Sequence, residues 1–60
     1  PRREAVARLP RELRAVVVLR YFQGLTLAET AQALDIPPGT VSTRQRKALS
    51  LLKLHLTEEV

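Results

Sequence analysis

Proline and glycine residues divide this chain into four short segments, and no other feature of the sequence limits its fold as strongly. A first segment at residues 2–8 ends before Pro10, because the residue that precedes a proline is pushed out of the α region. Pro10 also suits the first turn of a second helix, where its missing N–H removes no hydrogen bond. Gly24 follows that helix at a position where a left-handed cap residue is favoured. The spacing therefore predicts short helices separated by tight turns.

Apolar side chains recur at helical spacing within the second segment, at about residues 10–22. One face of this segment carries Leu13, Val16, Val17 and Arg20. The run at 15–19 would also fit a buried strand. The length of the whole segment and the caps on either side of it favour a helix.

The third segment has a clear start, because Thr26 and Glu29 have the spacing of a capping box. It must end by Pro37, so it is only about eight or nine residues long and needs tertiary packing to be stable. The last segment begins near Pro38 and contains no helix breaker up to about Leu56. One face of this last helix carries Val41, Gln45, Ala48 and Leu52.

Residues 26–46 have the pattern of a helix-turn-helix, in which two helices cross at a steep angle through a short turn. Such a crossing needs a small residue at the closest approach, and Ala31 provides it. Asp35 falls in the turn, where it tolerates a left-handed backbone better than most residues. Three apolar side chains are spaced to fill the angle between the helices: Leu34, Ile36 and Val41. We therefore expect an all-α domain of three to four helices around this motif, winged-helix-like but without a wing.

Basic residues are concentrated in the last segment. Residues 38–56 contain two arginines and two lysines but no acidic residue, whereas four acidic residues offset the six arginines of residues 1–37. A basic stripe on one helix is typical of a protein whose partner is a polyanion such as DNA. A solvated helix face is the alternative interpretation of the charge alone.

The first turns of the last helix would project outward from the motif. Free backbone N–H groups at its start suit a phosphate, and the polar side chains that follow can bond base edges or phosphates. The candidate DNA-binding residues are Thr40, Ser42, Thr43, Arg44, Arg46 and Lys47.

Each of these candidates has a plainer alternative. Ser42 and Thr43 would otherwise be ordinary exposed helix residues, and Arg44 would pair with Glu29 or with another acid inside the domain. Gln45 is expected at the rim of the core, since it shares its helix face with apolar residues.

The composition excludes several classes of protein. A chain of 60 residues is long enough for one domain, which we expect to span 1–60. It has no cysteine and one histidine, His55, so we expect no disulfide, metal or other cofactor. No nucleophile stands beside a base, so no enzyme is expected. No apolar run approaches a membrane span, and the lack of cysteine fits the reducing cytoplasm.

The run at 9–52 resembles region 4 of bacterial sigma factors of the extracytoplasmic-function group. The pairing of Gly-Thr-Val with Arg-Tyr-Phe-x-Gly is more specific than a generic helix-turn-helix. The residues that carry the resemblance are Leu9-Pro10, Arg14, Leu19-Arg20-Tyr21-Phe22, Gly24, Glu29, Ala31, Leu34, Ile36-Pro37, Gly39-Thr40-Val41, Arg44 and Ala48-Leu49.

The resemblance implies a fragment of a longer sigma factor, whose last helix binds the minus-35 element of double-stranded promoter DNA during transcription initiation. By position, Ser42, Thr43 and Lys47 would read bases. Thr40 and Arg44 would contact phosphates. The resemblance also implies docking on the flap of the RNA polymerase beta subunit.

Three residues depart from the pattern of that family. Thr30 and Gln45 stand where aliphatic residues are preferred, and we expect both to weaken the core of the motif. Ser42 stands where a lysine or arginine is frequent, which removes one long basic side chain from the expected DNA face.

Two other interpretations stay open. The output domain of a response-regulator-type activator shares the four-helix layout, although such domains usually dimerise on two-fold sites. A protein-interaction module would explain why leucines occupy more than one face of the last helix. Leu51 lies about 100° round the helix from Leu52, and Leu54 about 200°. We therefore predict that Leu51 and Leu54 face a partner, either polymerase or an inhibitory anti-sigma factor.

Overall fold

The computed structural model describes the backbone of residues 2–58 and the side chains of residues 4–53. It consists of α1 (Arg2–Ala7), α2 (Arg11–Val17), the π-helical segment η1 (Val18–Phe22), α3 (Leu27–Leu34) and α4 (Pro38–Glu58). No strand occurs in this part of the chain. The prediction of an all-α domain is confirmed.

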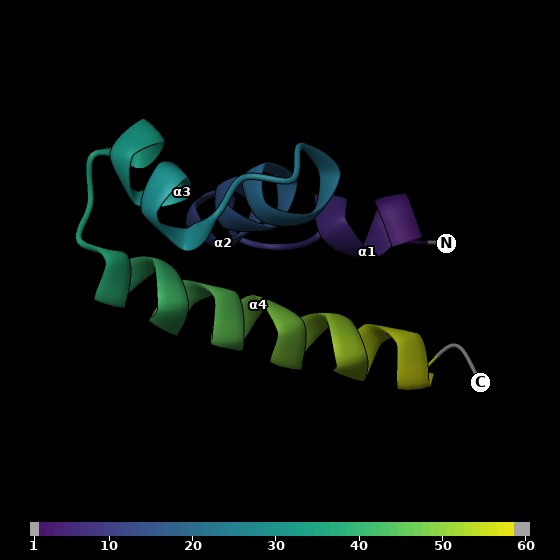
Figure 1. Ribbon diagram of the computed structural model, residues 1–60. Coiled ribbons are helices and arrows are strands. Elements are labelled where there is room, and N and C mark those ends of the chain that lie inside the picture. The colour runs from purple at the N-terminus through teal and green to yellow at the C-terminus, as the bar shows by residue number, and fades with distance from the viewer. Residues whose placement is uncertain (1, 59–60) are drawn as a thin grey trace.

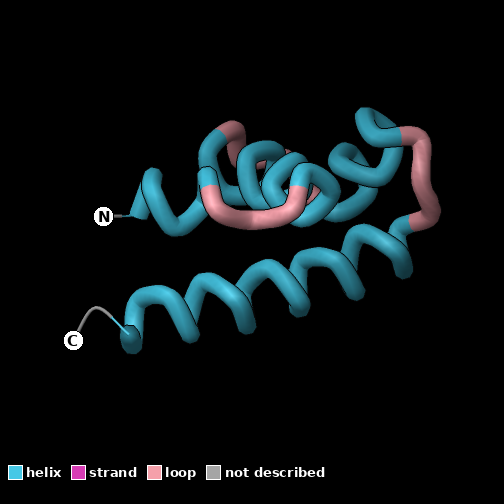
Figure 2. Tube along the Cα trace, turned by 180° about the vertical axis from the view of Figure 1, so that it is seen from behind, coloured by secondary structure: helices cyan, strands magenta, loops and turns pink. Residues whose placement is uncertain are grey.

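The long helix α4 lies along one side of the molecule, and the shorter elements lie together on its other side (Figure 1). Helix α3 lies beside the first turns of α4, and α1 lies beside its later turns. The view from behind shows the same arrangement, with a loop joining α3 to α4 at one end (Figure 2). The molecule measures 36 × 19 × 16 Å. Helix α4 therefore serves as the support along which the other helices are arranged.

The segment predicted as one helix at 10–22 changes its winding halfway. Pro10 is the N-cap of α2 and not its first helical residue. From Val18 onward the winding is π-helical: the Gln23 N–H donates to the carbonyl of Val18, five residues back, at 3.0 Å. Gly24 follows with a φ of 74°, so the predicted left-handed position is confirmed. Arg20, which α-helical spacing places on the same face as Leu13, Val16 and Val17, nevertheless reaches α4, where it bonds Gln45.

Local signals in the sequence set the ends of α3. The Glu29 N–H donates to Thr26 Oγ1 at 3.1 Å, and the Thr26 N–H donates to Glu29 Oε1 at 2.8 Å. The predicted capping box is therefore confirmed. At the other end Asp35 has φ 56° and ψ 48°, the left-handed conformation that the turn requires. Helix α4 begins at Pro38, as predicted.

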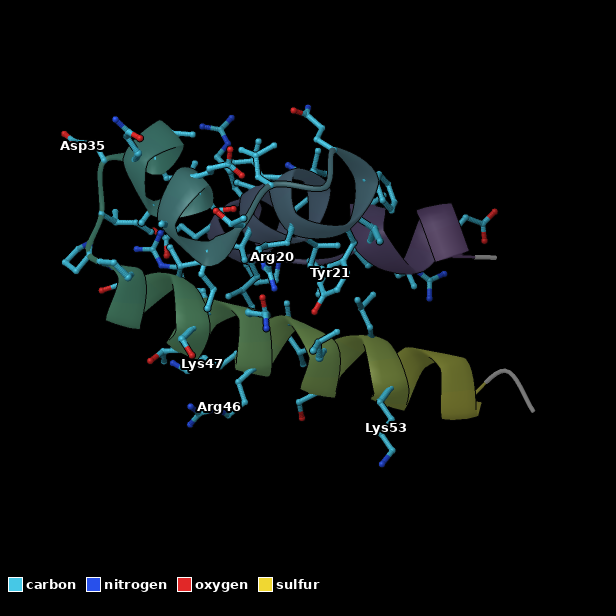
Figure 3. The ribbon with its side chains drawn as sticks, viewed as in Figure 1. Arg20, Tyr21, Asp35, Arg46, Lys47 and Lys53 are labelled. Carbon is cyan, nitrogen blue, oxygen red and sulfur yellow. The ribbon has the colours of Figure 1, made fainter. Side chains whose placement is uncertain are left out.

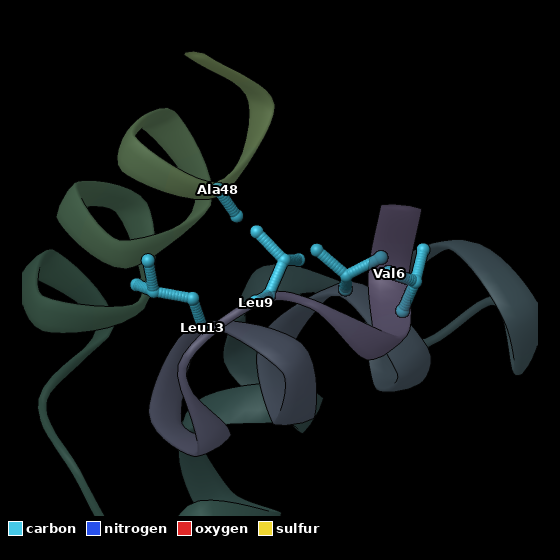
Figure 4. Close-up of a cluster of buried hydrophobic side chains, with 5 residues drawn as sticks. Val6, Leu9, Leu13 and Ala48 are labelled. Atoms are coloured by element: carbon cyan, nitrogen blue, oxygen red, sulfur yellow. The ribbon is translucent and has the colours of Figure 1, made fainter. Parts of the chain in front are cut away.

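Two groups of buried side chains hold the helices together. The first, which we call the helix-turn-helix cluster, joins α2, α3 and the start of α4; its members are Val16, Ala31 and Val41, with Leu34 and Ile36 packed against them. The second, which we call the α1 cluster, joins α1 and α2 to the middle of α4. Its members are Val6, Leu9, Leu13, Val17 and Ala48, with Leu51 and Leu52 packed against them. Figure 4 shows Ala48 facing Leu9 across this second cluster.

Leu51, one of the two leucines predicted to face a partner, is partly covered by the core that Leu52 also reaches. Leu51 and Leu52 are both half-buried and pack against the α1 cluster. The centre of the buried face is Ala48, which is fully buried, and Leu51 and Leu52 lie about 60° and 40° to either side of it. A core supplied by two helices is wide enough to take both. The side chain of Leu54 lies outside the described residues.

Thr30 is a fully buried polar residue, but it does not leave a polar group without a partner. Its hydroxyl donates to the carbonyl of Thr26 at 2.8 Å, one turn earlier in the chain. Within the described residues, no buried side-chain nitrogen or oxygen lacks a hydrogen bond. The departure at position 30 is therefore accommodated inside α3 itself.

Candidate nucleic-acid interface

The start of α4 is fixed by packing on one side and left open on the other. Val41 is completely buried, and Ala31, 5% exposed, allows the close approach of α3. The backbone of the first turn is held by the carbonyl of Pro37, which accepts from the N–H groups of Thr40 at 3.0 Å and Val41 at 3.2 Å. The remaining side chains of the first turns are therefore directed away from the core at a set angle.

Three of the six candidate residues are exposed: Thr43, Arg46 and Lys47. Figure 3 shows Arg46 and Lys47 on the side of α4 that faces away from the other helices. Lys53 lies on the same outer side, further along the helix. The exposed basic residues thus share the outer side of α4, beginning close to the turn of the motif.

The other three candidates, Thr40, Ser42 and Arg44, are half-buried. The Arg44 guanidinium forms an ion pair with the carboxylate of Glu12 at the start of α2, at 3.9 Å. Arg44 thus pairs with an acid inside the domain, as the alternative interpretation of the sequence expected, and the partner is Glu12 and not Glu29. A pair of this length near solvent contributes little stability, about 0–1 kcal/mol. Arg44 can therefore exchange this carboxylate for a phosphate at small cost.

The hydroxyl of Thr43 has a hydrogen-bond partner within α4. It donates to the carbonyl of Gly39 at 3.0 Å, one turn earlier. Its oxygen can still accept a hydrogen bond, and its methyl group is free to contact the methyl of a thymine. Thr43 is therefore better suited to accepting from a base, or to an apolar contact, than to donating.

Gln45 lies at the rim of the core, as predicted. Its Oε1 accepts a hydrogen bond from Arg20 Nε at 2.8 Å. Arg20 also donates from its NH1 group to the carbonyl of Leu25 at 2.8 Å. Sequence reasoning placed Arg20 on the buried face of α2 without a role. The one signal that could have indicated its partner is the polar Gln45 on an otherwise apolar helix face.

Acidic groups are kept away from the outer face of α4. The pKa of Glu29 is lowered from its ordinary value, first by the hydrogen bond that its carboxylate accepts from the Thr26 backbone N–H and second by a hydrogen bond with the Thr26 side chain. Glu29 is therefore an ionised cap of α3. The first turn of α4 carries no acidic residue. An approaching phosphate would meet basic and neutral side chains there.

Neither a metal site nor a membrane-spanning helix occurs within the described residues. No group of three or more histidine or acidic side chains lies close enough together there to hold a metal ion. Among the same residues, no helix has both the length and the apolar character needed to cross a membrane.

Comparisons with known proteins identify one family. The family described as sigma-70, region 4 matches residues 5–54. The chain is 38% identical over 56 residues to RNA polymerase sigma factor SigV of Bacillus subtilis, covering 93% of this chain and 34% of that protein. It is 36% identical over 55 residues to the ECF RNA polymerase sigma factor SigW of the same species, covering 92% and 29%.

A third relative is the ECF RNA polymerase sigma factor ShbA of Streptomyces griseus, 43% identical over 51 residues, covering 85% of this chain and 27% of that protein. No solved structure matches the chain. The chain spans about a third or less of the length of these relatives. Because the match to the family covers residues 5–54, nearly all of a chain that folds as a helix-turn-helix, the chain belongs to the sigma-70 region 4 family.

Proposed function

We propose that this chain recognises the minus-35 element of promoter DNA as the region 4 domain of a sigma factor, in a larger protein that directs RNA polymerase in the cytoplasm. The observation that carries the proposal is the outer face of α4. Its exposed side chains at 40–53 are polar or basic except for Leu49, and residues 38–56 contain no acidic residue. A helix of this kind, placed second in a helix-turn-helix, fits the major groove.

The exposure of each residue supports a division of roles. Thr43 and Lys47 are exposed and would read base edges, with Ser42 beside them. Arg44 and Thr40 lie closer to the other helices and would contact the phosphates that flank the groove. Arg46, exposed on the outer side, would add a further basic contact.

A titration of promoter duplex by fluorescence anisotropy, at several salt concentrations, tests the proposal. With about four or five phosphate contacts, log K should fall with log salt at a slope of roughly −4. Lys47→Ala or Thr43→Ala should change the preferred base at one position by roughly 1–3 kcal/mol. A flat salt dependence, or no binding at low salt, would contradict the proposal.

We also propose that the flap of the RNA polymerase beta subunit docks on the surface formed by α2, η1 and the end of α3. A groove of about 380 Å³ lies there, with an apolar floor and two arginines at its edge. An apolar segment flanked by acidic side chains fits this lining best. The groove is lined by Arg11, Arg14, Ala15, Val18, Leu19 and Leu34.

Leu51 stays a second candidate for contact with polymerase or with an anti-sigma factor, because it is only partly buried. Leu19→Asp and Leu51→Asp separate the two surfaces when binding to the purified flap is measured by calorimetry. We expect Leu19→Asp to abolish flap binding, whereas Leu51→Asp should act mainly by destabilising the α1 cluster. Loss of flap binding in a folded Leu51→Asp variant alone would place the partner on α4 instead.

A further inference from the structure

One arginine links the two helices of the motif through hydrogen bonds. Arg20, at the centre of η1, donates from Nε to Gln45 Oε1 and from NH1 to the carbonyl of Leu25, both at 2.8 Å. Its guanidinium carbon lies 5.9 Å from the centre of the Tyr21 ring. Figure 3 shows the side chains of Arg20 and Tyr21 pointing from η1 toward α4. The guanidinium is thus held in one plane by partners on two sides.

The two acceptors lie at positions that matter for the motif. Leu25 directly precedes Thr26, the N-cap of α3. Gln45 lies on α4 one turn after Val41, among the candidate DNA-binding residues. Arg20 therefore connects the entry of the first helix of the motif to the middle of the DNA-facing part of the second.

Hydrogen bonds constrain this geometry in a way that the apolar contacts do not. Burial of Val41 and Ala31 is favourable over a range of helix rotations, because the hydrophobic effect has no direction. The bond from Arg20 to Gln45 weakens steeply when its angle is lost. Side-chain tips lie roughly 5–6 Å from a helix axis, so a rotation of about 20° would move them by about 2 Å. Such a shift is enough to break a base contact.

We propose that Arg20 and Gln45 form a positioning pair that sets the rotation of α4 about its own axis, and with it the register of the base-reading residues. This inference rests on the proposed function of α4 in DNA binding. Arg20 acts through Gln45 and does not itself touch DNA. Its loss should therefore reduce discrimination between sequences, and leave the phosphate contacts in place.

The test compares the affinity of the chain for a promoter duplex and for a scrambled duplex, with folding of each variant checked by circular dichroism. The variants are Arg20→Leu, Gln45→Leu and the double variant, with Arg8→Leu as the control. Arg8 is an exposed arginine in the turn after α1 and matches the loss of charge. Each single variant should lower the ratio of the two affinities by about tenfold, the effect of one misplaced base contact. The double variant should be no worse than either single one.

Two further readouts separate positioning from a general loss of stability. The slope of log K against log salt should be unchanged in Arg20→Leu. In NMR spectra, the Nε–H signal of Arg20 should be protected from exchange in the wild type and lose that protection in Gln45→Leu. Arg20→Lys keeps the charge but cannot make both bonds in one plane, so it should also lose discrimination.

Unchanged discrimination in Gln45→Leu, with a wild type that discriminates, would overturn the positioning pair and leave the proposed function intact. A salt slope reduced by about one in Arg20→Leu would also overturn it, because that change is the sign of a direct phosphate contact. A wild-type chain that binds both duplexes equally would instead contradict the proposed function, and the positioning role with it.

Discussion

The two halves of α4 are held by different means. The first half, residues 38–47, packs through Val41 against the small side chain of Ala31, and it receives a hydrogen bond from Arg20. The second half packs through Ala48, Leu51 and Leu52 against the leucines and valines of α1 and α2. The first half of α4 is thus held by a small apolar contact and a directional hydrogen bond, and the second half is held by a broad aliphatic contact.

This difference shows how one helix can serve two purposes. Burial of leucine contributes roughly 25 cal/mol for each Å² removed from water and imposes no particular angle. Small side chains and hydrogen bonds contribute less free energy, but they define one geometry. We infer that the α1 cluster supplies most of the stability, and that the hydrogen bond from Arg20 to Gln45, with the close approach of α3 at Ala31, fixes the geometry of the candidate DNA face.

The largest effect should follow from Leu9→Ala in the α1 cluster. Leu9 is 4% exposed, and truncation of such a leucine costs about 2–5 kcal/mol. A domain of this size has only a few kcal/mol of stability in total, so much of the chain should unfold. Thermal denaturation followed by circular dichroism measures the loss. DNA binding that survives unchanged while helicity falls would mean that the two halves do not depend on each other.

A somewhat smaller loss of stability should accompany Ala31→Leu in the helix-turn-helix cluster. Overpacking at this crossing should cost about 1–3 kcal/mol and push α3 away from α4. Ala48→Leu in the α1 cluster is the matched change, since Ala48 is also buried. At equal folded fraction, anisotropy titrations should show weaker specific DNA binding for Ala31→Leu than for Ala48→Leu. Equal binding would remove the distinction between the clusters.

A positive charge in the first half of α4 should contribute more to DNA affinity than one in the second half. Arg44→Ala is expected to weaken binding to every DNA sequence by about 1 kcal/mol and to reduce the salt slope by about one. Lys53→Ala removes the same charge from the second half and should have less effect. Titrations of both variants against promoter and scrambled duplexes check this. A larger loss of DNA affinity in Lys53→Ala than in Arg44→Ala would mean that DNA lies along the whole helix.

The smallest effect concerns pH. Because the pKa of Glu29 is lowered in the folded state, its ionised form stabilises the fold above the ordinary carboxylate pKa. That contribution is lost as the pH falls through the lowered value. Melting temperatures measured below pH of about 4.3 should therefore decline slightly more for the wild type than for Glu29→Gln, which does not titrate. An identical decline in both would show that the cap contributes nothing that depends on charge.

Much of the fold could be predicted because the signals for it are local. The capping box at Thr26 and Glu29, the left-handed turn at Asp35 and the cap at Gly24 each depend on a few neighbouring residues. Ala31 at the helix crossing followed from the same motif. The resemblance to region 4 then indicated the function.

The rest could not be predicted because it depends on residues far apart in the chain. No local pattern in the sequence predicts the π-helical winding of η1. The bond between Arg20 and Gln45 spans 25 residues. The partial burial of Leu51 was not predicted because its angle was measured from Leu52, when the contact is centred on Ala48.

Because α4 is one uninterrupted helix, a tilt at the α1 cluster would be transmitted to its first turns. Thr43 lies nine residues before Leu52, which corresponds to about 13 Å along a helix that does not stretch. A tilt of about 5° at Leu52 would therefore swing Thr43 by about 1 Å, comparable to the tolerance of a base contact. Substitutions among the leucines would therefore shift Thr43 only to the extent that the contacts of Val41 and Gln45 yield to the tilt.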